Sequence, residues 1–264
     1  MLGMNPFSAL ADVIPPYAMQ GFIIAMIALI ALGTIIQMIN HKNLTYFLNN
    51  AKKAKLQATR EIGAGERASI LAKTAVVDIG TTSELGFGKR RLSHVLGMYG
   101  TIIFWVSSAM LIFCYTGADK SSSSIWSMLW HVGAILTCIG GYWFWFFLRV
   151  YVSAEAHPWY RIIKADLFVL ALLACSTFGL AWSYTQFNGQ VGLSYLFLTL
   201  FVVANLVLFG GVYWSKFAHM FYKPGAAIQK NLAEADGSRD NLPPLADAPK
   251  QFGLGIKREE PKHY

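Results

Sequence analysis

The sequence predicts an all-α integral membrane protein built as a bundle of five transmembrane helices, and three observations support this. Of its 264 residues, 55% are hydrophobic and only 14% are charged, whereas a soluble domain carries about 25% charged residues. The apolar residues gather in five runs, each close to or longer than the ~20 residues with which a helix crosses a bilayer. The basic residues gather between alternate runs. The predicted spans are residues 17–40, 92–115, 125–150, 165–186 and 192–216.

The first span, residues 17–40, follows a short segment that contains no lysine or arginine. A secretory signal peptide begins with a basic region and ends in a small-residue cleavage site, and its apolar stretch is shorter than this one. We therefore expect residues 17–40 to remain in the protein as a transmembrane helix.

The segment that follows, residues 41–91, carries ten of the 22 basic residues. Apolar residues repeat there at helical spacing, with lysines beside them: Leu44, Phe47, Leu48, Ala51 and Ala54. This pattern predicts a basic amphipathic helix that lies on the inner leaflet or on a partner protein. Residues 66–79 are a second helix candidate, because their apolar residues fall on one side.

The other four spans are separated by short connections, so we expect them to pack as one bundle. The basic residues number ten in 41–91, one in 116–124, three in 149–164, none in 187–191 and eight in 216–264. This alternation follows the positive-inside rule. It predicts an N-terminus outside and a C-terminus inside the cytoplasm. That the membrane is a bacterial inner membrane is implied only by the resemblance described below. The net charge is +8, and the basic residues gather in the segments that are predicted to face the cytoplasm. We therefore expect contact with membrane lipid and no nucleic acid partner.

The tail, residues 224–264, holds five of the nine prolines among charged and small residues. Such a composition buries little apolar surface, so we expect the tail to be disordered by itself. Two interpretations stay open: a peptide that folds onto a soluble partner, or a solvated chain end. The predicted domains are thus a membrane domain over 1–223 and a cytoplasmic tail over 224–264.

Few residues of the spans are suited to chemistry, and we expect no catalytic residue. Asp166, at the inner end of the fourth span, is the nearest carboxylate, which argues against a transporter driven by protons or sodium. Cys114, Cys138 and Cys175 include no CxxC pair. Because an iron–sulfur cluster usually needs four thiolates, we expect no such cluster in this chain.

His94 and His219 are the histidines best placed to hold a haem. One begins the second span and the other follows the fifth, both at the inner face, and a bundle haem needs two axial ligands at similar depth. His131 lies near the opposite leaflet, and His157 is an alternative inner ligand. Small residues share the helical faces of the pair: Gly97 and Thr101 beside His94, Gly211 and Ser215 beside His219. Such residues let a porphyrin approach, and they equally allow two helices to pack without a cofactor.

The cluster Lys89, Arg90 and Arg91 directly precedes the first of these histidines. It would neutralise haem propionates, attract an acidic partner, or contact phospholipid as an ordinary positive-inside cluster. If no haem is bound, the family resemblance described below implies a quinone site near the inner interface instead. Its walls would be Tyr99 and Tyr213, with Arg90 or Arg91 near a quinone oxygen.

The stretch GKRRLSHVLGMYG, residues 88–100, resembles the second span of the membrane subunits of the respiratory nitrate reductase gamma and heterodisulfide reductase type. The resemblance implies five spans, an outside N-terminus and haem ligands on spans two and five. In the dihaem pattern, a further histidine stands ten residues after the first and another about eighteen residues before the last. Here Phe104 and Phe201 occupy those positions. The resemblance therefore implies at most one haem b, held by His94 and His219.

Within that group the chain most resembles the membrane anchors of dissimilatory adenylylsulfate reductase in sulfur-oxidising bacteria. The cues are the opening MNPFSAL, residues 4–10, and the stretch NNAKKAK, residues 49–55. The resemblance implies a cytoplasmic flavin and iron–sulfur adenylylsulfate reductase as partner, which oxidises sulfite with AMP to adenylylsulfate. The anchor then passes electrons to the quinone pool, as a non-catalytic or quinone-reducing subunit. Two alternatives stay open: a haem-free scaffold that only tethers a cytoplasmic enzyme, and a small-solute transporter.

Overall fold

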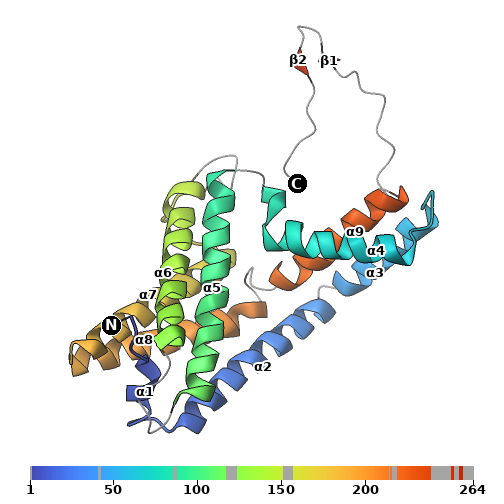
Figure 1. The fold of residues 1–264 in the computed structure, drawn as a ribbon. Coiled ribbons are helices and arrows are strands. Elements are labelled where there is room, and N and C mark those ends of the chain that lie inside the picture. Colours follow the sequence, from blue (N-terminus) through green and yellow to red (C-terminus); the bar gives the residue numbers. More distant parts are fainter. Residues whose placement is uncertain are drawn as a thin grey trace. The chain divides into compact units, whose positions relative to one another are not determined.

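The structure is a computed structural model that describes residues 2–40, 43–85, 88–116, 124–150, 157–213, 215, 219–238, 251–252 and 256–257. Five helices in these ranges are long and apolar enough to cross a membrane (Figure 1). They are α2 (Pro16–Asn40), α5 (Lys89–Cys114), α6 (Ser124–Trp143) with the π-helix η3 (Phe144–Leu148), α7 (Leu167–Phe187) after the 3-10 turn η4 (Lys164–Asp166), and α8 (Val191–Gly210) with the 3-10 turn η5 (Gly211–Tyr213). The predicted five-span, all-α membrane protein is confirmed.

The chain divides into two compact units, and each is described by itself. The membrane unit consists of Met1–Gln37 and Leu92–Ala218. The loop–tail unit consists of Met38–Arg91 and His219–Tyr264. This division differs from the predicted boundary at residue 223, because the long loop and the segment after the fifth span belong to the same unit.

In the membrane unit, α5 and α6 pack with their backbones in contact. A Cβ atom on Gly100, Gly133 or Gly140 would lie 2.5–2.6 Å from a backbone nitrogen of the facing helix. Ser93 of α5 adds a hydrogen bond across this contact, since its Oγ donates to the Gly140 carbonyl at 2.8 Å. Small residues let membrane helices approach closely enough for dispersion contacts between backbones. The glycines therefore fix how the second and third spans meet.

The next helix, α7, packs antiparallel to α6 and forms a hairpin with α8 through a short turn. Two polar contacts join α6 to α7. Tyr142 Oη lies 2.8 Å from Thr177 Oγ1, and His131 Nε2 lies 2.7 Å from Ser183 Oγ. These contacts fix the register of the two spans, because a shift of one residue would rotate both partners away from one another.

The core of the membrane unit is largely aromatic. Phe7, on the short helix α1 (Pro6–Leu10), meets the edges of Trp130 and Trp182 with ring centroids 5.9 and 5.4 Å apart. Phe104 and Phe201, the positions at which the dihaem pattern has histidines, contact each other at 6.3 Å. Edge-to-face rings at these separations attract beyond simple area burial. Aromatic side chains thus fill the space between the spans at this depth.

The loop–tail unit contains the two helices predicted for the loop. They are α3 (Asn43–Leu56) and α4 (Ala64–Lys73), the latter continued by the π-helix η1 (Thr74–Gly80) and followed by the 3-10 turn η2 (Ser83–Leu85). The fifth span is followed by α9 (His219–Asp236) and by a short antiparallel hairpin of β1 (Gln251–Phe252) and β2 (Ile256–Lys257).

Hydrogen bonds attach α9 to the helices of the loop. Asn231 Nδ2 lies 2.7 Å from both Thr74 Oγ1 and Asp78 Oδ2. At the end of α9, the Asp236 carbonyl accepts from the Thr59 backbone N–H at 2.8 Å. These contacts explain why α9 runs through Pro224 to Asp236, where composition alone predicted disorder. The hydrogen-bond partners of Asn231, Thr74 and Asp78, precede it by more than 150 residues. The composition of the tail alone therefore cannot indicate them.

An exposed ion pair closes the turn between α3 and α4. Arg60 pairs with Glu66, and its Nε also donates to the Ala235 carbonyl of α9. The hydrogen bond from Arg60 lowers the pKa of the Glu66 carboxylate below its usual value. This contact therefore favours ionised Glu66 and helps to hold the turn against α9.

Candidate functional site

The two predicted haem ligands belong to different units. His94 lies near the start of α5 in the membrane unit and is exposed in the isolated chain. His219 is the first residue of α9, and its side chain lies outside the described part of the structure. Bis-histidine ligation by this pair therefore stays a prediction.

The small residues expected beside the haem have other contacts in the structure. Thr101 is buried, and its Oγ1 lies 3.4 Å from Thr137 Oγ1 of α6. A Cβ on Gly211 would lie 3.3 Å from the Leu167 side chain. Both positions thus serve helix packing. The space off Gly97 is open, since a Cβ there would meet no described atom within 4 Å.

The predicted basic and tyrosine contacts separate into different roles. Arg91 Nε and Nη2 each lie 2.8 Å from oxygens of Thr81, so this arginine ties the start of α5 to the end of η1. Arg90 is exposed. Tyr99 is 42% exposed on α5, and the half-buried Tyr213 ends η5. Arg90 and Tyr99 are therefore accessible to a ligand in the isolated chain, whereas Arg91 is engaged in hydrogen bonds with Thr81.

Sequence reasoning identified Asp166 but missed its partner. Arg149, fully buried at the end of the third span, donates from Nη2 to Asp166 Oδ2 at 2.5 Å. Its guanidinium carbon lies 4.3 Å from the centroid of the Trp145 ring. It also donates to the carbonyls of Pro158 and Arg161 at 2.8 and 2.7 Å. The paired carboxylate of Asp166 therefore holds the ends of two spans together.

His131 is fully buried in α6, and both ring nitrogens have hydrogen-bond partners. Nδ1 lies 2.7 Å from the Ser127 carbonyl and Nε2 lies 2.7 Å from Ser183 Oγ. The ring also meets Trp130 edge to face at a centroid distance of 4.9 Å. A haem ligand must present a free nitrogen lone pair to iron. Both His131 nitrogens are engaged within the membrane unit, and the prediction that His131 is not a haem ligand stays a prediction.

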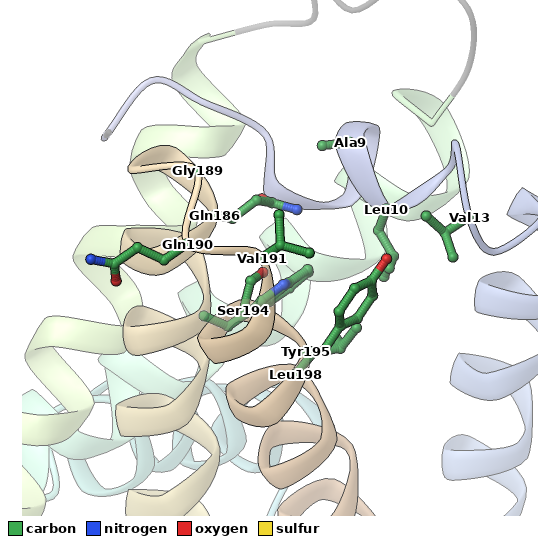
Figure 2. Close-up of a pocket in the computed structure, with 11 residues that line it drawn as sticks. Ala9, Leu10, Val13, Gln186, Gly189, Gln190, Val191, Ser194, Tyr195 and Leu198 are labelled. Atoms are coloured by element: carbon green, nitrogen blue, oxygen red, sulfur yellow. The ribbon is translucent and has the colours of Figure 1, made fainter.

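A cavity that the sequence did not predict opens where α1 meets the turn between α7 and α8. Figure 2 shows residues of the N-terminal segment on one side and residues of α8 on the other. The cavity measures about 180 Å³. Its lining includes Leu10, Val13, Trp182, Gln186, Ser194 and Tyr195. The sequence has polar residues near the end of the fourth span, Gln186 among them, but no pattern that predicts a cavity there.

One atom of that lining lacks a partner. Gln186 Nε2 donates to the Pro6 carbonyl at 3.2 Å. The same side chain's Oε1 is buried and has no hydrogen-bond partner among the described residues. A buried acceptor left unsatisfied costs about 1–3 kcal/mol. Because this oxygen has almost no exposed surface, it is not accessible from the cavity.

Within the described ranges, no group of three or more histidine, cysteine, aspartate or glutamate side chains is placed to hold a metal ion. No family model, curated protein or solved structure matches this chain. Its function must therefore be argued from its own residues and geometry.

Proposed function

We propose that this chain is the membrane anchor and electron-transfer subunit that links a cytoplasmic adenylylsulfate reductase to the quinone pool. The observation that carries the proposal is the surface of α3 in the loop–tail unit. Lys52, Lys53 and Lys55 are exposed there, while Ala54 between them is 5% exposed. The three lysines, called the α3 lysine surface below, therefore project from a folded unit and not from a loose loop.

A folded basic surface favours a protein partner. The amphipathic face of α3 does not lie wholly on lipid, since a Cβ on Gly225 of α9 would lie 3.8 Å from the Phe47 ring. Leu56, beside the lysines, stays 87% exposed. Positive charges next to an exposed apolar side chain suit an acidic protein surface, because complementary charge steers association and fixes orientation. The partner proposed from the resemblance is the flavin and iron–sulfur enzyme that oxidises sulfite.

Electrons would then reach quinone at the membrane by one of two routes. His94 and His219 would hold one haem b between the partner and the quinone. Alternatively, quinone would accept electrons directly from the partner's last cluster at a site near Arg90, Tyr99 and Tyr213. The open space off Gly97 leaves room for a flat ligand on that part of α5.

A haem-free scaffold that only tethers the enzyme is the second candidate. The packing of Thr101 against Thr137 and of Gly211 against Leu167 favours it. Two of the small residues expected to face a haem already contact neighbouring helices.

A docking assay tests the proposal. Membrane vesicles with the cytoplasmic face outward and containing the chain are mixed with purified adenylylsulfate reductase, and the bound fraction is measured by sedimentation. Replacing Lys52, Lys53 and Lys55 by Gln should weaken binding about tenfold, since three favourable charges are lost. Binding should also weaken with salt, because the screening length is only ~8 Å at physiological ionic strength.

The matched control replaces the same three lysines by Arg, which keeps the charge and should keep the binding. If the Gln and Arg variants bind the enzyme equally well, the α3 lysine surface is not the docking site.

An absorption spectrum separates the two candidates. A b-type α-band on dithionite reduction that is lost in both His94→Ala and His219→Ala, and kept in His131→Ala, supports the haem route. A band lost with His131 and kept without His94 would contradict it. A protein without the band that still supports sulfite-dependent quinone reduction favours direct transfer. A protein without the band or that activity is a scaffold.

A further inference from the structure

Residues 157–166 lead into the fourth span through a turn that the buried Arg149 holds in place. The Arg149 guanidinium donates to the carbonyls of Pro158 and Arg161 at 2.8 and 2.7 Å, and the Arg149 carbonyl accepts from the His157 N–H at 3.2 Å. The Arg161 N–H donates to the Pro158 carbonyl at 3.0 Å. This segment, called the 157–166 turn below, therefore presents its outward side chains at fixed positions.

The side chains that this turn exposes are apolar and basic. Trp159, Tyr160 and Ile162 are 56%, 70% and 65% exposed. Arg161 and Lys164, which alternate with them along the chain, are exposed as well. Large apolar side chains gathered on a surface mark contact with a protein or a membrane. The surface that covers this turn therefore offers apolar groups next to negative charge.

A row of four rings joins the turn to the exposed apolar side of the third span. Phe146 of η3 stacks on Tyr142, with ring centroids 6.1 Å apart and ring planes 16° apart. The Phe146 ring also lies 6.3 Å from the Trp159 ring, and Trp159 meets Tyr160 edge to face at 5.7 Å. Tryptophan and tyrosine gather where the hydrocarbon of a bilayer meets its head groups. The row therefore indicates that the turn lies at the level of the lipid head groups.

The charges of the turn favour an anionic head group. Asp166, the one acidic residue in the 157–166 turn, is buried and paired with Arg149. Arg161 and Lys164 form no ion pair with any residue in the described ranges, so both charges are available where lipid phosphates lie. The same surface continues into the exposed rings of the third span. A phospholipid covers both the basic and the apolar part, whereas a water-soluble protein reaches only the basic part.

We propose that the 157–166 turn and the row of rings bind an anionic phospholipid. Arg161 and Lys164 contact its phosphate group, and one acyl chain lies along the Phe146 and Tyr142 rings. Arg149 is a positioning residue, because it holds the turn from within the protein. This site goes beyond the proposed function, since it requires neither the reductase nor a quinone.

Fluorescence quenching by brominated lipids measures which lipid lies beside Trp159. The full chain is placed in nanodiscs of phosphatidylglycerol and phosphatidylcholine, with one of the two lipids brominated near the glycerol. The emission of Trp159 is the part that is lost in Trp159→Phe, and each variant below is compared with the same variant carrying this change. We expect phosphatidylglycerol to bind about tenfold more tightly than phosphatidylcholine, because each basic side chain near an anionic head group favours it several-fold. Arg161→Gln combined with Lys164→Gln should abolish this preference while both lipids still quench Trp159.

The matched control combines Lys52→Gln with Lys53→Gln, which removes the same charge from exposed positions on α3 and should keep the preference at Trp159. A preference that survives in Arg161→Gln with Lys164→Gln, or that falls equally in the α3 control, overturns the inference. Trp159 emission that neither brominated lipid quenches also overturns it, because the turn then lies outside the bilayer. If Arg161→Gln with Lys164→Gln weakens reductase binding and leaves the lipid preference unchanged, the turn contacts a protein and the lipid proposal fails.

Discussion

Several interactions stabilise the buried charge of Arg149. A charge taken out of water is expensive, and it is tolerated only when ion pairing and hydrogen bonds replace the lost hydration. Asp166 supplies the opposite charge, and the carbonyls of Pro158 and Arg161 accept further hydrogen bonds. The Trp145 ring contributes a cation–π contact. The ends of the third and fourth spans are thereby joined at one point.

Removing one partner of this ion pair should destabilise the membrane unit strongly. Asp166→Asn leaves the Arg149 charge buried without a counter-charge, which should lower the free energy of unfolding by about 3–5 kcal/mol. Unfolding in mixed micelles, followed by circular dichroism, measures this change.

The double variant Arg149→Met with Asp166→Leu is the comparison. It removes both charges and should recover most of the lost stability, because apolar replacements of buried ion pairs are often tolerated. If the single and double variants are equally unstable, the ion pair is not what holds the span ends.

Single residues were predicted unevenly from the sequence. A charge such as Asp166 at a span end is visible in sequence, but its pairing with Arg149 depends on how two helices meet. His94, Arg90 and Tyr99 could be proposed because the charge pattern predicts their depth in the membrane. Gln186 could not, since an unsatisfied oxygen exists only after α1 has folded over the end of α7.

At the scale of elements, the α5–α6 contact depends on glycine more than on any polar group. Gly140→Leu would place a Cβ within 2.5 Å of the Gly97 nitrogen, so the two helices must separate. Overpacking of this kind costs about 1–3 kcal/mol, and sometimes more. We expect a clear fall in the melting temperature of the purified protein, measured by circular dichroism.

Gly21→Leu is the matched control on α2. A Cβ at Gly21 would meet no described atom within 4 Å, so this variant should melt close to the unchanged protein. A Gly140→Leu protein that melts like the control would show that α5 and α6 do not rely on this backbone contact.

The spans and the two loop helices were predictable because each follows from local pattern. A run of about twenty apolar residues suffices for a span, and helical spacing suffices for α3. The helix α9 was not predictable in the same way. Its polar residue Asn231 reaches Thr74 and Asp78, which precede it by more than 150 residues. Sequence reasoning weighed that segment alone and therefore expected disorder from Pro224.

At the scale of the whole molecule, α9 completes the loop–tail unit. We expect a chain truncated after Ser238 to keep this unit, since the hydrogen bonds of α9 to η1 and to the turn between α3 and α4 come from Asn231 and Asp236. A chain truncated after Ala218 loses α9 and exposes the side of α3 that contains Phe47, which lies close to Gly225 of α9. Its loop 43–85 should be cut by trypsin at least several-fold faster, as seen by gel electrophoresis of membrane vesicles, and its binding of the reductase should fall with it.

Comparing these two truncations distinguishes the effect of losing the helix α9 from the effect of losing the basic residues after residue 238. The shorter chain lacks α9, whereas the longer one lacks only the segment after residue 238 and its basic residues. Equal trypsin sensitivity of the two chains would mean that α9 does not hold the loop helices in place.

The loop–tail unit also sets an order of events during synthesis. Its two parts lie on either side of four membrane spans, from Arg91 to His219, so roughly 130 residues must be translated between them. At about 5–20 residues per second, this takes on the order of 6 to 26 s. During that interval α3 and α4 have been synthesised but α9 has not. A ribosome that stalls within the last spans therefore leaves α3 and α4 without their contacts to α9. If the chain anchors a soluble enzyme as proposed, the enzyme would then be recruited only to chains whose membrane part has been made in full.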